Sequence, residues 1–272
     1  MAFVESIPRA LTIAGSDSGG CAGIQADLKT FGALEVHGMS VITSVTAQDT
    51  RRVHTSSDLP LETIERQIEA VIEDIGVDAV KTGMLPSAEI IDVVSEKVKQ
   101  FQIERLVVDP VMVSTGGDPL MGQEAVKVMK SKLFPQALVV TPNLQEAEFL
   151  TGHKITNEKE LKEALEEIFE LGPTSVIVKG GHSTDLNQST DHFFDGETFR
   201  LFSEPRIETK NTHGSGCTFA AAITAYLARG LDLMESIASA KKYTTEAIRH
   251  SFPLGQGHGP LGHFWKYWQS EQ

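Results

Sequence analysis

The segment Ala10-Leu-Thr-Ile-Ala-Gly-Ser-Asp-Ser-Gly-Gly-Cys-Ala-Gly23 carries the pattern that decides the fold of this chain. Its first part, residues 10–14, is a short apolar run with β-branched residues, which is typical of a buried strand. A glycine-rich turn follows, and residues 22–34 then have the apolar spacing of a helix. A strand that turns directly into a helix is one βα step, the repeating unit of parallel α/β sheets.

The same step recurs along most of the chain. Short apolar runs alternate with longer amphipathic stretches, whose apolar side chains repeat with the period of a helix. Strands are expected at 39–46, 78–81, 105–109, 137–140 and 175–179, and helices at 61–75, 88–100, 124–132, 144–150 and 158–170. This alternation predicts a three-layer α/β/α fold, with a mostly parallel central sheet, helices on both faces and right-handed crossovers.

The alternation changes once, late in the chain. In residues 192–202, apolar positions alternate on either side of Asp195-Gly196, which indicates a β-hairpin. Two helices and a glycine-rich tail follow, and they are expected at 215–229, 233–250 and 255–262. No internal repeat, low-complexity tract or linker divides the sequence, so residues 1–272 are expected to form a single domain.

Composition narrows the possible functions. The 272 residues carry a formal net charge of −13, which argues against a nucleic-acid or anionic-membrane partner, because phosphate-backbone binding needs a basic face. No stretch approaches the ~20 apolar residues of a membrane span, and no secretory signal is visible, so a cytoplasmic location is expected. The two cysteines, Cys21 and Cys217, lie in glycine-rich loops and lack the spacing of a disulfide framework or a zinc site.

Ligands of open α/β sheets bind beyond the carboxyl ends of the strands, so the segments that follow the strands are the first candidates for a site. After the first strand, Gly15 and Gly20 have the spacing of the two glycines of a P-loop. Cys21-Ala22 stands where that motif requires Lys-Ser/Thr, so its chemistry is absent. The glycines favour either close approach of the backbone to a ligand or a flexible turn.

The segment Asn211-Thr-His-Gly-Ser-Gly-Cys-Thr218 precedes a helix of small residues. Backbone N–H groups at Gly214, Ser215 and Gly216 can point to one spot, where the helix N-terminus adds partial positive charge. This favours a site for an oxyanion or a phosphate. The same helix end is expected to lower the pKa of Cys217, which favours a thiolate able to accept a hydroxyl proton. The alternative is a helix cap beside a small buried cysteine.

Two carboxylates, Asp109 and Glu146, follow other expected strands. Hard oxygen ligands at strand ends suit Mg²⁺ that is bound to phosphates. The spacing of Asn143 and Glu146 equally fits a helix capping box, so both interpretations stay open. Lys179 and Lys241 can neutralise phosphate charge, although a surface lysine is more often only solvated.

Taken together, these segments resemble the hydroxymethylpyrimidine and phosphomethylpyrimidine kinases of thiamine biosynthesis, which belong to the ribokinase-like superfamily. The resemblance extends from about Ala10 to His263. It is carried by Ala10-Leu-Thr-Ile-Ala-Gly-Ser-Asp17, Ala22-Gly-Ile-Gln-Ala-Asp-Leu-Lys-Thr-Phe31, Thr46-Ala-Gln48, Val80-Lys-Thr-Gly-Met84, Val107-Val-Asp-Pro-Val-Met112, Thr141-Pro-Asn-Leu-Gln-Glu146, Val178-Lys-Gly-Gly-His182 and the segment 211–218.

The resemblance implies ATP- and Mg²⁺-dependent phosphorylation of a small molecule, 4-amino-5-hydroxymethyl-2-methylpyrimidine, and then of its monophosphate. A base is required only for the first acceptor, and a homodimer is the family expectation. Residue by residue, the resemblance places Gly214, Ser215 and Gly216 in an anion hole with Cys217 as base, Asp109 and Glu146 near magnesium, Lys179, Thr212 and Lys241 on the nucleotide side, and Asp17, Gln48, Met84 and Val111 in the pyrimidine pocket.

The chain departs from the family pattern at Cys21, Asp49 and residues 114–118, and a side chain at Cys21 could either narrow the substrate pocket or alter which ring fits. The nearest rival is a pyridoxal or pyridoxine kinase of the same branch. Gln48 favours a pyrimidine, because its amide can both donate to and accept from an aminopyrimidine edge. A more distant alternative is a dinucleotide-binding oxidoreductase, but the chain lacks the G-x-G-x-x-G motif that such an enzyme carries after its first strand. A non-catalytic relative is expected to have lost Cys217 or the two carboxylates, which are present.

Overall fold

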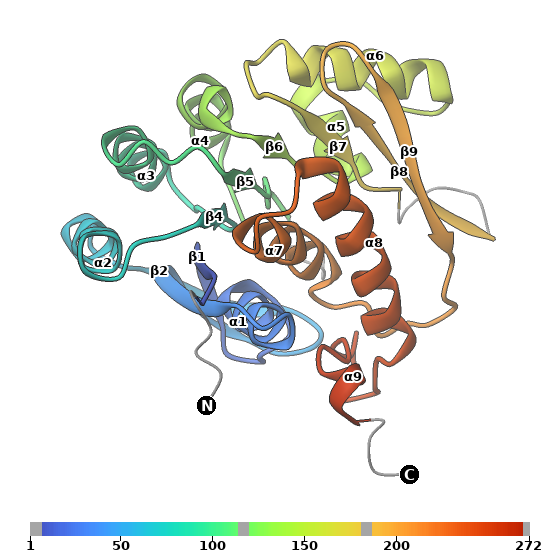
Figure 1. Cartoon of the computed structure of the whole chain (residues 1–272), viewed down its shortest axis with the longest axis horizontal. Coiled ribbons are helices and arrows are strands. Elements are labelled where there is room, and N and C mark those ends of the chain that lie inside the picture. Colours follow the sequence, from blue (N-terminus) through green and yellow to red (C-terminus); the bar gives the residue numbers. More distant parts are fainter. Residues whose placement is uncertain (1–6, 114–119, 181–186, 269–272) are drawn as a thin grey trace.

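A nine-stranded sheet runs through the middle of the protein (Figure 1). The computed structural model describes residues 7–113, 120–180 and 187–268. The strands lie in the order β3-β2-β1-β4-β5-β6-β7-β8-β9. Their bounds are Arg9–Asp17 (β1), His37–Gln48 (β2), Val53–Asp58 (β3), Ala79–Thr82 (β4), Leu106–Val108 (β5), Val139–Val140 (β6), Val176–Val178 (β7), Gln188–Phe194 (β8) and Phe199–Pro205 (β9).

The strands from β2 to β7 in this order all run parallel. Only β3 at one edge and the β8–β9 hairpin at the other are antiparallel to their neighbours. The mostly parallel sheet and the late hairpin are therefore confirmed. Each parallel crossover passes over a helix, as the alternating sequence pattern predicts.

Nothing in the sequence predicts the edge strand β3. Its six residues are mostly polar, and all but Val53 are exposed. The strand pairs with β2 through a register that places Thr55 opposite Ala47 and Asp58 opposite Ser44. Backbone hydrogen bonds, which carry no sequence signature, hold it in place, so hydrophobic periodicity misses it.

Helices cover both faces of the sheet and enclose two hydrophobic cores (Figure 1). Alternate residues of each strand enter opposite cores, so Leu106 and Val108 face one layer while Val107 faces the other. One layer contains α2 (Leu61–Asp74), α3 (Ala88–Gln100), α4 (Gln123–Val128), α5 (Leu144–Thr151) and α6 (Glu158–Phe169), and the other contains α1 (Gly23–Ala33), α7 (Ser215–Ala228) and α8 (Leu233–Arg249).

Two helical details differ from the prediction. The helix expected at 124–132 ends as α4 at Val128 and continues as a widened π turn, Met129–Leu133, which packs against α3 with Met129 and Leu133 fully buried. A short C-terminal helix, α9 (Trp265–Trp268), lies in a segment without helical periodicity. Packing of large side chains, rather than a helical repeat in the sequence, positions both pieces.

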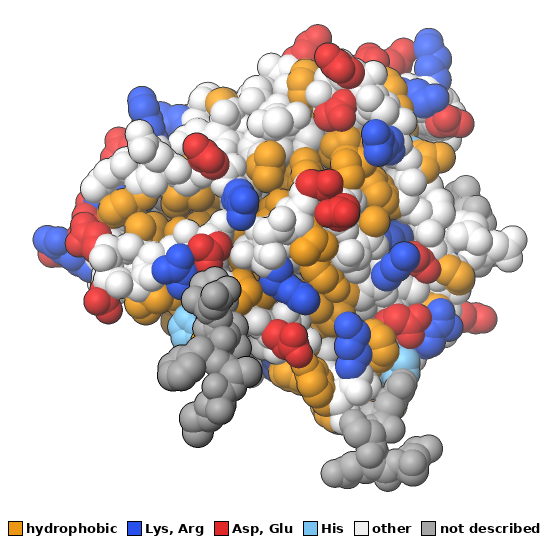
Figure 2. Space-filling view, viewed as in Figure 1, with side chains coloured by type: hydrophobic (Ala, Val, Ile, Leu, Met, Phe, Trp, Pro, Cys, Tyr) orange, Lys and Arg blue, Asp and Glu red, His pale blue; other side chains and the backbone are white. Residues whose placement is uncertain are grey.

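The surface agrees with the acidic composition of the chain. Figure 2 shows acidic and basic side chains interspersed over one face, with no continuous basic stripe on it. Within the described residues, no helix combines the length and the apolar character that crossing a membrane requires.

Because β1, β2, β4, β5, β6 and β7 are parallel, their carboxyl ends meet at one edge of the sheet. Helix α7 packs against α1, β1, β4 and β5, which brings its N-terminus to the same edge. Most of the predicted site residues come from the segments at these strand ends and from the start of α7, whereas Lys241 comes from α8. The fold therefore gathers them from segments far apart in the sequence.

Candidate active site

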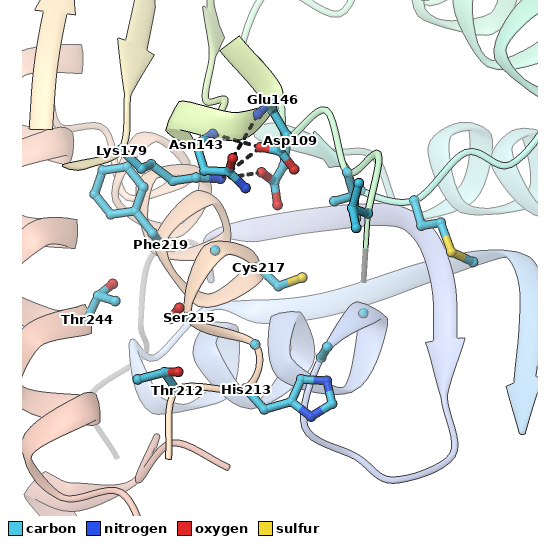
Figure 3. Close-up of a pocket in the computed structure, with 18 of the residues that line it drawn as sticks. Asp109, Asn143, Glu146, Lys179, Thr212, His213, Ser215, Cys217, Phe219 and Thr244 are labelled. Atoms are coloured by element: carbon cyan, nitrogen blue, oxygen red, sulfur yellow. Dashed lines mark hydrogen bonds and ion pairs between the residues drawn. The ribbon is translucent and has the colours of Figure 1, made fainter. Parts of the chain in front are cut away.

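One pocket, with a volume of about 710 Å³, lies at the carboxyl edge of the parallel strands. Every residue that the sequence suggests for the site lines it: Asp17, Gln48, Met84, Asp109, Val111, Glu146, Lys179, Thr212, Gly214, Ser215, Gly216, Cys217 and Lys241. Figure 3 shows Asp109, Glu146 and Lys179 at one end, His213 at the opposite end and Cys217 between them. The sequence prediction of a common site at this edge is thus consistent with the geometry.

The start of α7 is fixed by a close backbone contact. Gly214 has a φ of 82°, and a Cβ at this position would lie 1.9 Å from the carbonyl oxygen of Cys21. Only glycine fits this left-handed conformation without strain. Gly214 caps α7 without any side-chain hydrogen bond, so N–H groups in the first helical turn remain available to an anion.

A carboxylate–lysine cluster forms the wall opposite α7. The Nζ atom of Lys179 donates to Oδ1 of Asp109 over 2.8 Å and lies 3.9 Å from Oε2 of Glu146. All three side chains are buried or nearly so. The cluster therefore places two carboxylates and one ammonium group at the pocket surface, with the ammonium close to the N-terminus of α7: a Cβ at Gly216 would lie 3.3 Å from Lys179 Nζ.

Glu146 also closes a capping box at the start of α5. Its Oε2 accepts from the backbone N–H of Asn143 at 2.7 Å, and its own N–H donates to Oδ1 of Asn143 at 2.9 Å. Burial raises the pKa of Glu146 to about 7, against the opposing effect of the Lys179 charge. The capping interpretation is thus confirmed, and the same carboxyl group still reaches the pocket.

Lys241 on α8 is buried and tied to the hairpin. Its Nζ donates to Asp191 Oδ1 at 2.8 Å and to Ser189 Oγ at 3.1 Å. Asp191 also accepts from the backbone N–H of Gly180, at 2.9 Å. Sequence reasoning missed Asp191 and Ser189, because both lie just before the apolar alternation that marks the hairpin.

The expected lowering of the Cys217 pKa is wrong. Burial raises the pKa of this thiol to about 12, and the charges of Asp27 and Asp109 act in the same direction, whereas Lys81 opposes them. The helix N-terminus alone favours the thiolate, but loss of water around the sulfur outweighs that effect. Cys217, which is partly accessible from the pocket, is therefore a protonated thiol at neutral pH.

Asp17 holds the turn between β1 and α1. Its carboxylate accepts from the backbone N–H groups of Gly19, Cys21 and Ala22 at 2.8 to 2.9 Å, and its exposed fraction is only 3%. Cys21 is buried and is not among the residues that line the described pocket. The alternative in which Cys21 narrows the substrate pocket is therefore wrong, because its side chain packs beneath the turn.

At the end of the pocket far from Lys179, Gln48 pairs with His213. Their Nε2 atoms lie 3.1 Å apart, and burial lowers the pKa of His213, which keeps the ring neutral. His213 lines the pocket, and sequence reasoning missed it although it lies within the segment 211–218. No charged residue or metal ligand lies beside His213 in the sequence, so nothing in the sequence indicates its contact with Gln48.

The glycine-rich tail ties this end of the pocket together. Thr50 Oγ1, two residues after Gln48, accepts from the backbone N–H groups of Gln256 and Gly257, and its carbonyl oxygen accepts from His258 N–H at 3.0 Å. The neighbouring carboxylate of Asp49 turns away to bind the backbone of Arg51 and Arg52 and the ring of His54, at distances of 2.7 to 3.0 Å. The Asp49 carboxylate is thus hydrogen-bonded by residues close to it in the sequence.

The same tail reaches the anion-binding segment. Gly259 donates through its N–H to Oδ1 of Asn211 at 3.2 Å, and its carbonyl oxygen accepts from His213 N–H at 3.2 Å. The tail therefore connects the loop that carries Gln48 with the loop that leads into α7. Among the predicted loops, residues 114–118 and 181–186 lie outside the described residues.

Comparisons with known proteins agree on one family. A family model described as phosphomethylpyrimidine kinase matches residues 17–262. The chain is 49% identical to the hydroxymethylpyrimidine/phosphomethylpyrimidine kinase of Bacillus subtilis, over 95% of this chain and 96% of that protein. It is 52% identical to a thiamine biosynthesis bifunctional protein of Geobacter sulfurreducens, over 93% of this chain and 51% of that protein. It is also similar to the crystal structure of an ADP complex of Bacillus subtilis pyridoxal kinase, with a TM-score of 0.89 and 42% identity over 95% of this chain and 98% of that chain.

The close contact at Gly214 gives a direct test. Gly214→Ala is expected to lower the free energy of unfolding by on the order of 2 kcal/mol or more, because it combines left-handed strain with a backbone clash. Gly152→Ala is the matched control, since Gly152 has the same φ of 82° with no atom within 4 Å of the added Cβ. Urea denaturation measures the free energy of unfolding of both variants. Equal losses of stability would show that the close contact of Gly214 with Cys21 adds nothing to the cost of the left-handed conformation.

Proposed function

Because this chain belongs to the phosphomethylpyrimidine kinase family, we propose that it transfers a phosphoryl group from ATP to 4-amino-5-hydroxymethyl-2-methylpyrimidine and then to its monophosphate. These reactions belong to thiamine biosynthesis. The observation that carries the proposal is the arrangement in one pocket of a helix N-terminus, a carboxylate–lysine cluster, a thiol and a paired side-chain amide. The first three serve phosphoryl transfer, and the last serves recognition of the ring.

The nucleotide side of the pocket is proposed to lie between α7 and the cluster of Lys179. Backbone N–H groups at Gly214, Ser215 and Gly216 would bind the transferring phosphoryl group, because these residues line the pocket at a helix N-terminus. The N–H of Ser215 donates to the carbonyl oxygen of Thr212 at 3.1 Å and would exchange this partner for a phosphate oxygen. The ammonium group of Lys179 lies beside them. Thr212 and Lys241 line the same region and complete the proposed nucleotide site.

The carboxylates of Asp109 and Glu146 fit the chemistry of a Mg²⁺ site, because hard oxygen donors close to bound phosphates are what this ion prefers. Their oxygens are buried in the pocket wall and compete for one ammonium group. When bound, Mg²⁺ would offset negative charge on the transferring phosphate oxygens. The described residues contain no cluster of three His, Cys, Asp or Glu side chains suited to a metal, so phosphate oxygens would complete the proposed coordination.

Cys217 is proposed to receive the proton of the alcohol. Its side chain lies between the cluster of Asp109 and Lys179 and the ring of His213 (Figure 3). The monophosphate attacks with an oxygen that is already ionised, so its phosphorylation needs no base. Position and electrostatic stabilisation would then supply most of the rate for both acceptors.

Gln48 is proposed to read the aminopyrimidine edge, with Asp17, Met84 and Val111 as the remaining walls of the ring pocket. His213 contacts Nε2 of the Gln48 amide and Thr46 Oγ1 donates to its Oε1 at 3.3 Å, so the amide has a defined orientation. Pyridoxal is the second candidate substrate, favoured by the 42% identity to a pyridoxal kinase. We further propose that residues 1–272 act as one kinase domain and form a homodimer.

A side-by-side assay tests the function. The purified protein is given ATP and Mg²⁺ with hydroxymethylpyrimidine, its monophosphate or pyridoxal, and both ADP and the phosphorylated product are measured. A higher kcat/KM for the two pyrimidines is expected. A preference for pyridoxal would instead assign the chain to pyridoxal phosphorylation and remove Gln48 as the discriminating residue.

Replacement of the proposed base should separate the two acceptors. Cys217→Ala is expected to lower kcat for the alcohol by about 100-fold, a typical value for loss of a general base, and to leave turnover of the monophosphate within a few-fold. Cys21→Ala is the matched control, because this second cysteine is buried outside the pocket. Unchanged alcohol turnover in Cys217→Ala would exclude Cys217 as the base.

The two roles of Glu146 can also be separated. Glu146→Gln keeps an oxygen that accepts from Asn143 N–H, so the helix cap survives, but it removes the negative charge. The Mg²⁺ concentration for half-maximal activity is expected to rise several-fold, while the melting temperature is retained. An unaltered Mg²⁺ titration would leave Glu146 with the capping role alone.

A further inference from the structure

A buried ion pair that the proposed reaction does not use lies below the pocket. Lys81 on β4 and Asp27 on α1 are both fully buried, and Lys81 Nζ lies 3.0 Å from Asp27 Oδ2. The same oxygen accepts from Thr12 Oγ1 at 2.6 Å, whereas Oδ1 of Asp27 has no hydrogen-bond partner in the described part of the chain. Buried ion pairs rarely stabilise a protein more than apolar side chains of similar size do. Stability alone is therefore a weak explanation for this pair.

The pair lies next to Cys217. The backbone N–H of Gly23, the first residue of α1, contacts the Cys217 sulfur, and Asp27 follows one helical turn later. On the other side, a Cβ at Gly83, which lines the pocket, would lie 3.0 Å from Lys81 Nζ. Lys81 itself does not line the pocket, so its ammonium group lies behind the wall that Gly83 forms, and both α1 and β4 pack against α7, which carries Cys217 in its first turn.

Four charged groups face Cys217 from four elements. Lys81 on β4 and Lys179 after β7 favour a negative sulfur, whereas Asp27 on α1 and Asp109 after β5 oppose it. Lys81 has the largest effect of these charges on the pKa of Cys217, and it acts against burial. Burial alone would lower the pKa of Lys81, but the charges of Asp27, Cys217 and Asp109 raise it above its usual value, so the group stays an ammonium ion.

We propose that Lys81 is a positioning residue for the first phosphorylation: its buried charge supports the thiolate of Cys217, and the second phosphorylation does not need it. The inference rests on the proposed function. In the alcohol reaction, the Cys217 thiolate takes the hydroxyl proton while the alcohol oxygen bonds to the γ-phosphorus and the bond to the ADP oxygen breaks. The thiol then returns that proton to water before the next turnover.

The monophosphate reaction has a different proton balance. Its attacking phosphate oxygen carries negative charge and has no proton to lose, so the protonation state of Cys217 does not enter the step. Loss of the Lys81 charge should therefore slow only one of two reactions that share a pocket, a nucleotide and a phosphoryl donor. A purely structural role of Lys81 would affect both equally.

Two variants with the same isosteric change at position 27 isolate the ammonium group. Asp27→Asn retains an oxygen for Thr12 Oγ1 and keeps Lys81, whereas Asp27→Asn combined with Lys81→Met removes both charges and leaves no buried charge unpaired. The double variant is expected to lose about tenfold in alcohol turnover relative to Asp27→Asn for each unit by which the Cys217 pKa rises. Monophosphate turnover should stay within threefold in both variants. Equal alcohol rates in the two variants, or parallel loss with both acceptors, would overturn the proposal.

A measurement without any substrate distinguishes failure of the inference from failure of the proposed function. The rate of Cys217 alkylation by iodoacetamide reports the thiolate fraction, and a Cys21→Ala background removes the other thiol. The pH at which alkylation accelerates should be higher in the double variant than in Asp27→Asn. Coinciding pH profiles would contradict the inference, whereas failure of the unmodified protein to phosphorylate either pyrimidine would contradict only the proposed function.

Lys97→Met is the matched control for loss of a buried lysine. Lys97 is 7% exposed, lies on α3 and pairs with Glu65 and Glu69, and it does not line the pocket. The control is expected to lower the melting temperature without changing the ratio of alcohol to monophosphate turnover. A change in that ratio in Lys97→Met would show that the ratio responds to stability, and would remove the support for Lys81.

Discussion

Contact between the turn after β1 and the start of α7 is the constraint on which the rest of the pocket depends. The backbone of Gly214 lies so close to Cys21 that no side chain fits between them. Asp17 fixes the first turn through three backbone N–H groups, so the N-terminus of α7 is positioned by a rigid partner. The first turn of α7 therefore lines the same cavity as Asp109 and Lys179, which follow other strands.

That geometry also explains why the ligand-free pocket tolerates its charges. Lys179 pairs with Asp109, Lys241 with Asp191, and Glu146 is held by the backbone at the start of α5. Each buried charge thus has a partner before any ligand binds, as burial of ionised groups requires. Under the proposed mechanism, a nucleotide with its metal would exchange these partners rather than create a new charged site, so little rearrangement of the walls would be needed.

Regular packing was predictable from the sequence, and irregular contacts were not. Apolar runs with a helical or strand period predict the parallel sheet and the hairpin, because burial leaves a mark at each position. The pocket residues are predicted instead from the segments that follow the strands and, for Asp17, Gln48, Met84, Val111 and Thr212, from the family resemblance alone. The strand at Val53–Asp58 leaves none, since its residues are polar and mostly exposed and it is joined to β2 mainly through its backbone. The contacts of His213 with Gln48 and of Thr50 with the tail join residues more than 150 positions apart. The raised pKa of Cys217 likewise depends on burial, which the local motif does not contain.

A protonated thiol at the position of the base suits a pocket that must accept two nucleophiles. A carboxylate in place of this thiol would stand beside the phosphate of the second acceptor. Two unit charges 4 Å apart repel by about 4 kcal/mol at an effective dielectric constant of 20. A thiol whose pKa burial raises to about 12 is uncharged at neutral pH and avoids that repulsion. The same burial makes the thiolate scarce when the alcohol is bound, so a nearby buried positive charge matters most for that first acceptor.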